Sequence, residues 1–180
     1  MQQSWRLDCD KLTFIVCHAP STPQPDYIKP EVDDAPDSMI GDVNLFLYDD
    51  EDEEVEHGET GTRPVIGELE IMIASKPSRG KGLARETLLA FMSYIPIHLP
   101  AILEEYRAGS DERSERFLKY LRVKIDQHNE KSLGLFGKSG FEKVSEKPNY
   151  FGEVEMRMTV VEGSLEGKLD GVGRVLRYGD

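Results

Sequence analysis

A glycine-rich turn between a strand pattern and an amphipathic helix pattern restricts the folds open to this chain more than any other feature. The turn reads Ser78-Arg79-Gly80-Lys81-Gly82-Leu83-Ala84-Arg85. An apolar strand pattern over residues 66–74 precedes it, and apolar residues follow it at helical spacing, at Ala84, Leu88, Phe91, Met92 and Ile95. Small residues let backbone N–H groups converge at such a turn, and the helix N-terminus adds partial positive charge. The turn is therefore suited to bind a pyrophosphate.

Two other phosphate-binding motifs do not fit the same residues. A P-loop needs a glycine five positions before Gly80 and a hydroxyl after the Gly-Lys pair, but the chain has Ser75 and Gly82 there. A dinucleotide-binding motif needs a glycine where the chain has Arg85, and it needs a βαβ unit that the preceding strands do not suggest. An ordinary glycine-rich turn with solvated basic residues stays open as the alternative.

The remaining patterns predict an α/β (α+β) fold. Strands are expected at residues 12–17, 39–48, 66–74, 121–125, 143–146 and 153–161, and helices at 81–95 and 130–139. The second and third strands suggest an antiparallel hairpin whose tip is the acidic run 49–56. Pro96 and Pro100 are expected to end the first helix, with 104–116 as a surface helical insertion. Prolines at 20–36 predict a mobile loop at 19–38, and glycines after 161 predict a flexible tail at 162–180.

Charge and cysteine usage exclude several classes of protein. The formal net charge is -12, which opposes wrapping of a nucleic-acid backbone. Cys9 and Cys17 form no CxxC pair and follow no secretory leader, so we expect both to be reduced. No apolar run approaches the roughly 20 residues of a membrane-spanning helix, and the four histidines show no metal-ligand spacing. We expect a soluble, cytoplasmic protein with no metal, nucleic-acid or membrane partner.

Two motifs carry a resemblance to a known family. Arg79, Gly82 and Ala84 form R-x-x-G-x-A, which resembles the acetyl-CoA signature of GNAT enzymes, and NEKSLGLFGKSGF at 129–141 resembles the second GNAT motif. The segments QQSWRLDCDKLTFIV, MIGDVNLFLYDDEDE and GELEIMIASKPSRGKGLARE further resemble the N-acetyltransferase 9 family, a RimJ/RimL-like branch. The resemblance spans roughly residues 2–160, with interruptions at the proline-rich loop and at 96–117.

The resemblance implies a GNAT fold, with a central mixed, mostly antiparallel sheet, one splayed strand pair and flanking helices. It implies a single GNAT domain at 1–161, in which 19–38 and 96–117 are loops or insertions. The N-terminal strand and two helices of the fold are expected to be missing. Either an incomplete gene model or a lost part of the acceptor wall would explain this, and both explanations stay open.

Acetyl-CoA is the co-substrate that the resemblance implies. Backbone groups of Met72, Ile73 and Ala74 would pair with its pantetheine arm, and Asn129 and Ser132 would face it from the second helix. The pyrophosphate would lie on Arg79, Gly80, Lys81, Gly82, Leu83, Ala84 and Arg85. A helix N-cap is the alternative role for Asn129, and one residue is able to fill both roles.

The implied reaction is acetyl transfer to an amine, which must be deprotonated before it attacks. Strand alternation places Glu68 and Glu70 on one face, so either is a candidate base; otherwise both are polar residues of a half-exposed strand. Many GNAT enzymes have a tyrosine where this chain has Phe136, which cannot donate a proton. Tyr150 is a candidate substitute, with packing as its alternative role.

Three functions follow from these expectations. Animal members of the resembled family are associated with acetylating tubulin N-termini, which favours a protein N-terminal α-amine, such as that of tubulin, as the acceptor. A catalytically weak or inactive GNAT-fold protein that acts on the cytoskeleton by contact is the second function. Acetylation of a small-molecule amine is the third, and no sequence feature favours it.

Overall fold

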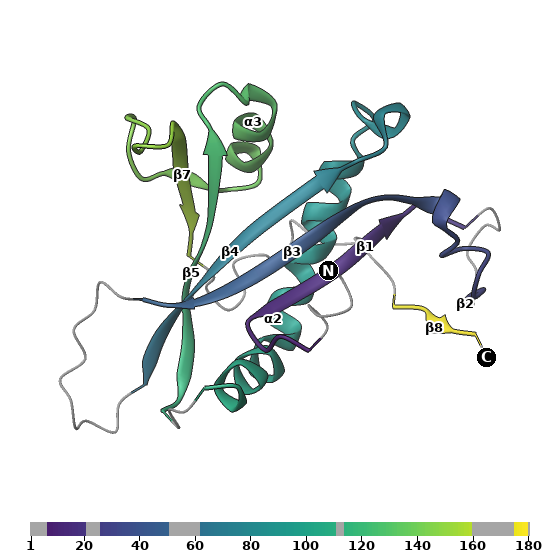
Figure 1. Ribbon diagram of the computed structural model, residues 1–180, viewed down its shortest axis with the longest axis horizontal. Coiled ribbons are helices and arrows are strands. Elements are labelled where there is room, and N and C mark those ends of the chain that lie inside the picture. Colours follow the sequence, from purple (N-terminus) through teal and green to yellow (C-terminus); the bar gives the residue numbers. More distant parts are fainter. Residues whose placement is uncertain (1–6, 21–25, 51–61, 111–113, 160–174, 180) are drawn as a thin grey trace.

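The computed structural model describes residues 7–20, 26–50, 62–110, 114–159 and 175–179, and its centre is a six-stranded sheet (Figure 1). The strand order is β1-β3-β4-β5-β7-β6. The strands are β1 (Lys11–Cys17), β3 (Met39–Asp49), β4 (Arg63–Ile73), β5 (Arg116–Asp126), β6 (Glu142–Lys143) and β7 (Glu153–Met158). Only β4 and β5 are parallel, and every other neighbouring pair of this sheet is antiparallel. The predicted mixed, mostly antiparallel sheet is confirmed.

Two helices and one sheet face form the core. The helix α2 (Leu83–Ala108) runs behind β4, β3 and β1 in Figure 1, and α3 (Glu130–Lys138) lies near the ends of β5 and β7. Apolar residues from both helices belong to the same buried cluster as inward-facing strand residues, among them Val43, Leu45, Leu69, Leu88, Phe91, Met92, Ile95, Val123 and Phe136. By length and hydropathy α2 could cross a membrane, but core helices pass the same test. Its buried apolar residues are those of a helix that packs on a sheet.

The first helix is longer than its sequence predicted. We expected Pro96 and Pro100 to end it, but α2 continues through both prolines and ends at Ala108, before Gly109. Each proline removes one backbone donor, a local cost that packing can outweigh. Ile95 and Ile102, on either side of the prolines, are 0% and 8% exposed, so continuing the helix buries both side chains. Residues 104–108 therefore belong to α2, and the next strand begins at position 116 and not at 121.

The expected hairpin is confirmed. β3 and β4 pair from Gly41 opposite Ile73 to Asp49 opposite Val65, while residues 51–61 at its tip lie outside the described part of the chain. Before β1, residues 1–6 lie outside the described part of the chain, and residues 7, 9 and 10 lie in turns.

The proline-rich loop and the end of the tail are more ordered than predicted. The loop contains β2 (Tyr27–Ile28) and the short 3-10 helix η1 (Pro36–Ser38), and the tail contains β8 (Arg177–Tyr178). β2 and β8 pair in parallel, Gly179 N–H donates to the Ile28 carbonyl at 2.8 Å, and the Tyr178 hydroxyl donates to Asp34. Two short extended segments of the predicted loop and tail thus supply each other's backbone partners.

Candidate active site

The parallel strands β4 and β5 separate part of the way along their length. Their pairing runs from Arg63 opposite Arg116 to Glu68 opposite Arg122, and residues 69–73 of β4 have no partner on β5. Figure 1 shows the two strands diverging toward their carboxyl ends. A cavity of about 340 Å³ lies there, lined by Asp42, Leu69, Glu70, Ile71, Met72, Val123, Lys124, Ile125, Asp126, Asn129, Ser132 and Phe136. The predicted splayed strand pair is confirmed.

The glycine-rich turn has the backbone shape that its sequence predicted. Gly80 and Gly82 have φ of 74° and 88°, in the left-handed region where a side chain causes strain. Gly82 is the N-cap of α2, and its carbonyl accepts the first helical bond, from Arg85 N–H at 2.9 Å. The N–H groups of Leu83 and Ala84 precede that bond, so they are free of intrahelical partners. The turn therefore offers backbone donors and a helix N-terminus to an anion.

The basic side chains of the turn have different surroundings. Lys81 and Arg85 are exposed, as a contact with a bound phosphate requires. Arg79 instead donates from Nε to the Ile73 carbonyl at 2.7 Å and from a terminal nitrogen to the Ala74 carbonyl at 3.3 Å. Arg79 thus ties the turn to the end of β4, and the carbonyls of Ile73 and Ala74 already hold a donor. Of the three predicted backbone positions, Met72 alone lines the cavity.

The second helix places its first turn at the cavity. Asn129 is the N-cap of α3 and accepts from Ser132 N–H at 3.1 Å, and both residues line the cavity. Asn129 is thus a helix N-cap, which was the alternative role expected for it, and it also lies at the cavity. Phe136 follows on the same helix, 4% exposed and edge-on to Phe141. It forms an apolar wall where a proton donor was expected from related enzymes.

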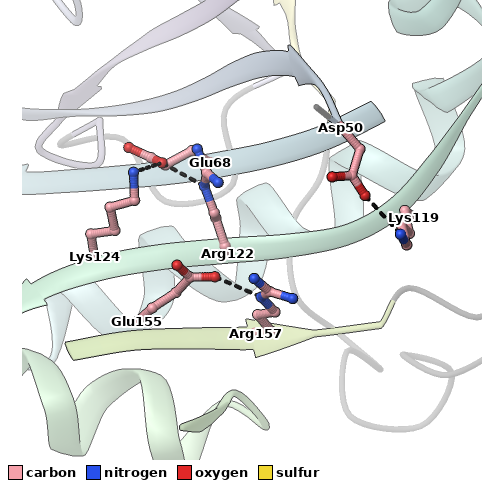
Figure 2. Close-up of polar contacts among 7 residues, drawn as sticks. All are labelled: Asp50, Glu68, Lys119, Arg122, Lys124, Glu155 and Arg157. Atoms are coloured by element: carbon pink, nitrogen blue, oxygen red, sulfur yellow. Dashed lines mark hydrogen bonds and ion pairs between the residues drawn. The ribbon is translucent and has the colours of Figure 1, made fainter. Parts of the chain in front are cut away.

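Glu68 is held by two cations. Its carboxylate accepts from Arg122 Nε at 2.7 Å and lies 3.3 Å from Lys124 Nζ (Figure 2). The Glu68 side chain is only 14% exposed, and Arg122 also lies over the Tyr48 ring at 5.3 Å. A proton donor at this carboxylate would have to displace one of the two cations. The contacts therefore favour an anchoring role for Glu68.

Glu70 faces the cavity without such a pair. Its side chain is exposed and forms no ion pair with any residue that the structure describes. Partial burial, with the negative charges of Glu68 and Asp42, raises the pKa of Glu70. A carboxylate with a raised pKa takes a proton from an ammonium more readily. Of the two predicted candidate bases, Glu70 therefore has the better surroundings.

The other candidate residues do not reach the cavity. Tyr150 is 97% exposed on the turn before β7 and is absent from the lining, which leaves it without support as a proton donor. Within the described residues no group of ligands suits a metal ion, and both cysteines are free thiols. In the acidic run only 49 and 50 are described, and the buried Asp50 pairs with Lys119 at 2.7 Å (Figure 2).

Sequence reasoning missed Asp42. It lies on β3 opposite Met72, lines the cavity and lies close enough to Glu70 to raise the pKa of that residue. The available signal was the alternation of polar and apolar residues along β3. Asp42 and Asn44 lie on one face of the strand, and the apolar Val43 and Leu45 lie on the other.

Comparisons with known proteins agree with this geometry. Residues 6–142 match the family model described as an acetyltransferase (GNAT) domain. The chain is 36% identical over 176 residues to the human alpha/beta-tubulin-N-acetyltransferase 9, covering 97% of this chain and 68% of that protein. It is 34% identical over 176 residues to an N-acetyltransferase 9-like protein of Schizosaccharomyces pombe, covering 88% and 74%.

Solved structures share the fold at lower identity. A spermidine N-acetyltransferase of Vibrio cholerae aligns with a TM-score of 0.51 and 17% identity, over 92% of this chain and 73% of that chain. NAA60 of Arabidopsis thaliana, solved with a bisubstrate analogue, aligns with a TM-score of 0.50 and 12% identity, over 84% and 77%. At these identities the likeness concerns the fold alone.

Proposed function

Because the chain belongs to the GNAT acetyltransferases, in the N-acetyltransferase 9-like family, we propose that it transfers acetyl from acetyl-CoA to a protein N-terminal α-amine. The family makes the chain an N-acetyltransferase. One observation carries the cofactor and the reaction together: a cavity lies between the separated ends of β4 and β5, and β4 leads through the 3-10 helix η2 (Lys76–Ser78) into the glycine turn that opens α2.

The residues present fit acetyl-CoA. Backbone N–H groups at Leu83 and Ala84, together with exposed Lys81 and Arg85, suit the pyrophosphate. Residues 69–73 pair with β3 but have no partner on β5, and their backbone groups on the β5 side suit the amide-bearing pantetheine arm. Bound there, acetyl-CoA supplies an activated acyl thioester.

Glu70 supplies the base in this proposal. An acceptor ammonium gives one proton to the Glu70 carboxylate, which passes it to solvent, and the neutral amine then carries a free electron pair. When the carbon–nitrogen bond forms and the carbon–sulfur bond breaks, a second amine proton ends on the coenzyme A thiol. The raised pKa of Glu70 supports the first transfer. Phe136 has no proton to give to the sulfur, so in this proposal the second amine proton reaches the sulfur through water.

The acceptor assignment rests on relatives. Proteins named alpha/beta-tubulin-N-acetyltransferase 9 occur in human, mouse and Drosophila melanogaster at 36–37% identity to this chain. We therefore place a protein α-amine first, with tubulin as the leading acceptor and the cytoplasm as the compartment.

Calorimetry and product analysis test the proposal in two steps. Acetyl-CoA should release binding heat with the wild-type chain and none with Gly82→Glu, because a side chain at φ 88° strains the turn and its carboxylate repels the pyrophosphate. Ala101→Glu is the matched control, since it adds the same charge at an exposed position later in α2. Equal heats for all three chains would refute the cofactor site.

The second step asks whether acetyl is transferred. Mass spectrometry of peptides with free α-amines, including tubulin N-terminal sequences, should show a gain of one acetyl group that depends on acetyl-CoA. Cofactor heat without any product would favour a catalytically inactive GNAT-fold protein. This second function is a candidate because Phe136, at the cavity, has no proton to donate to the leaving thiolate.

A further inference from the structure

One wall of the cavity lies on the sheet face that points away from α2. Val43 and Leu45 of β3 face the core under α2, so Asp42 and Asn44, which alternate with them, lie on the opposite face. On that face Asp42 is opposite Met72, and Asn44 is opposite Glu70. Asp42 and Glu70 therefore lie on one face of neighbouring strands, and both line the cavity.

The negative charges on this wall are not matched by ion-paired cations in the described part of the chain. Lys124 also lines the cavity, but its ammonium lies 3.3 Å from Glu68, which Arg122 neutralises as well. Asp126 at the far side accepts a backbone N–H from His128 at 2.8 Å. Asp42 and Glu70 have no cation among the described residues, and the charge of Asp42 contributes to raising the pKa of Glu70. A bound cation would relieve the repulsion between the two carboxylates.

The hydrogen-bonding groups of the same face are short of donors. Asn44 is 3% exposed and donates from Nδ2 to Asp42 Oδ2 at 2.8 Å, which fixes the Asp42 carboxylate. The Asn44 Oδ1 is buried and has no hydrogen-bond partner in the part of the chain described, and neither has Thr13 Oγ1 on the adjacent strand. Buried polar atoms are rarely left unpaired in native proteins. Asn44 therefore acts on the cavity through Asp42, whose carboxylate it holds at the cavity wall.

We propose that Asp42, held in place by Asn44, binds the ammonium group of the acceptor beside Glu70. A primary ammonium carries a positive charge and three donors, which match the two carboxylates of Asp42 and Glu70 at the cavity. Asp42 then binds, Asn44 positions Asp42, and Glu70 removes the proton. This assignment rests on the proposed amine acetylation and names the residues that select its acceptor.

The kinetic test separates binding from proton removal. With the best peptide of the panel, Asp42→Asn should raise KM for the peptide about 10- to 100-fold with little change in kcat, because it removes a charge-assisted hydrogen bond. Glu70→Gln should mainly lower kcat, by about 100-fold or more. Asn44→Leu should raise KM as well, and Asp37→Asn, an exposed aspartate on η1, should change neither constant. An unchanged peptide KM in Asp42→Asn would overturn the proposal.

An equilibrium test does not depend on turnover. In the presence of coenzyme A, calorimetry should show tighter binding of a peptide with a free α-amine than of the same peptide with an acetylated N-terminus, and Asp42→Asn should abolish the difference. A third peptide, blocked at its α-amine but carrying one lysine, assigns the site to a side-chain ammonium if it binds equally well. Equal binding of the free and blocked peptides to the wild-type chain would overturn the inference, even if acetyl transfer occurs. Failure of the proposed function shows instead as ammonium-selective binding without product.

Discussion

Replacing Glu68 by glutamine should destabilise the protein and loosen its cleft without removing the catalytic base. Glu68 and Arg122 are the last paired positions before β4 and β5 separate, and their side chains are 14% and 17% exposed. Breaking a fully buried ion pair costs about 3–5 kcal/mol, and an exposed pair contributes about 0–1 kcal/mol. This partly buried pair lies between the two, so we expect Glu68→Gln to lower the free energy of unfolding by about 1–3 kcal/mol. In a domain of this length that corresponds to a fall in Tm of about 2–10 °C.

Thermal or urea unfolding measures the change, and calorimetry with acetyl-CoA reports on the cleft. Glu155→Gln is the matched control. Glu155 and Arg157 both lie on β7 and form an ion pair at 2.6 Å (Figure 2). Their side chains are 26% and 39% exposed, so this pair is more exposed than that of Glu68 and Arg122. Glu155→Gln should lower the free energy of unfolding by less than about 1 kcal/mol. Wild-type stability in Glu68→Gln, combined with a large loss of kcat, would refute the anchoring role and make Glu68 the base.

Three further predictions concern single residues. Glu70→Gln should raise Tm at pH 7 and leave it unchanged near pH 4, as thermal unfolding at the two pH values measures: the raised pKa of Glu70 means that stability is lost as the pH rises through that pKa, and glutamine removes this loss. Gly41→Ala should weaken acetyl-CoA binding and lower Tm, since the added Cβ would overlap the Met72 carbonyl oxygen at the cavity, and a retained affinity in calorimetry would contradict this. Tyr106 donates to Asp49, and burial together with that negative charge raises its pKa to about 12. Tyr106→Phe should therefore leave the rise in phenolate absorbance up to about pH 10.5 unchanged, and a smaller rise in the variant would show that Tyr106 ionises normally.

Local patterns predicted the elements that define the site. The alternation of Glu68 and Glu70 with Leu69, and the glycines before α2, were visible in the sequence because a strand face and a positive φ each depend on near neighbours. The N-cap at Asn129 is equally local. These signals predicted which strand separates from its neighbour and where the two helices begin.

Features that depend on distant residues were not predictable in the same way. α2 continues through Pro96 because its packing against the sheet outweighs a local preference. The roles of Arg79 and Glu68 became distinguishable only when their partners were known, at the end of β4 and on β5. Asp42 needed the register of β3 on β4, which brings it to the cavity from a strand outside both motifs.

The parallel pairing of β4 with β5 has a consequence for the order in which the chain folds. β3 and β4 are neighbours in sequence, so their hairpin closes one loop, whereas β5 reaches β4 only after the 26 residues of α2 have crossed the sheet. Contacts of large sequence separation form slowly, because the intervening chain loses its entropy before the contacts stabilise it. We therefore expect the cleft between β4 and β5 to form after the hairpin. A ligand that binds only the completed cleft should then slow unfolding more than it speeds folding.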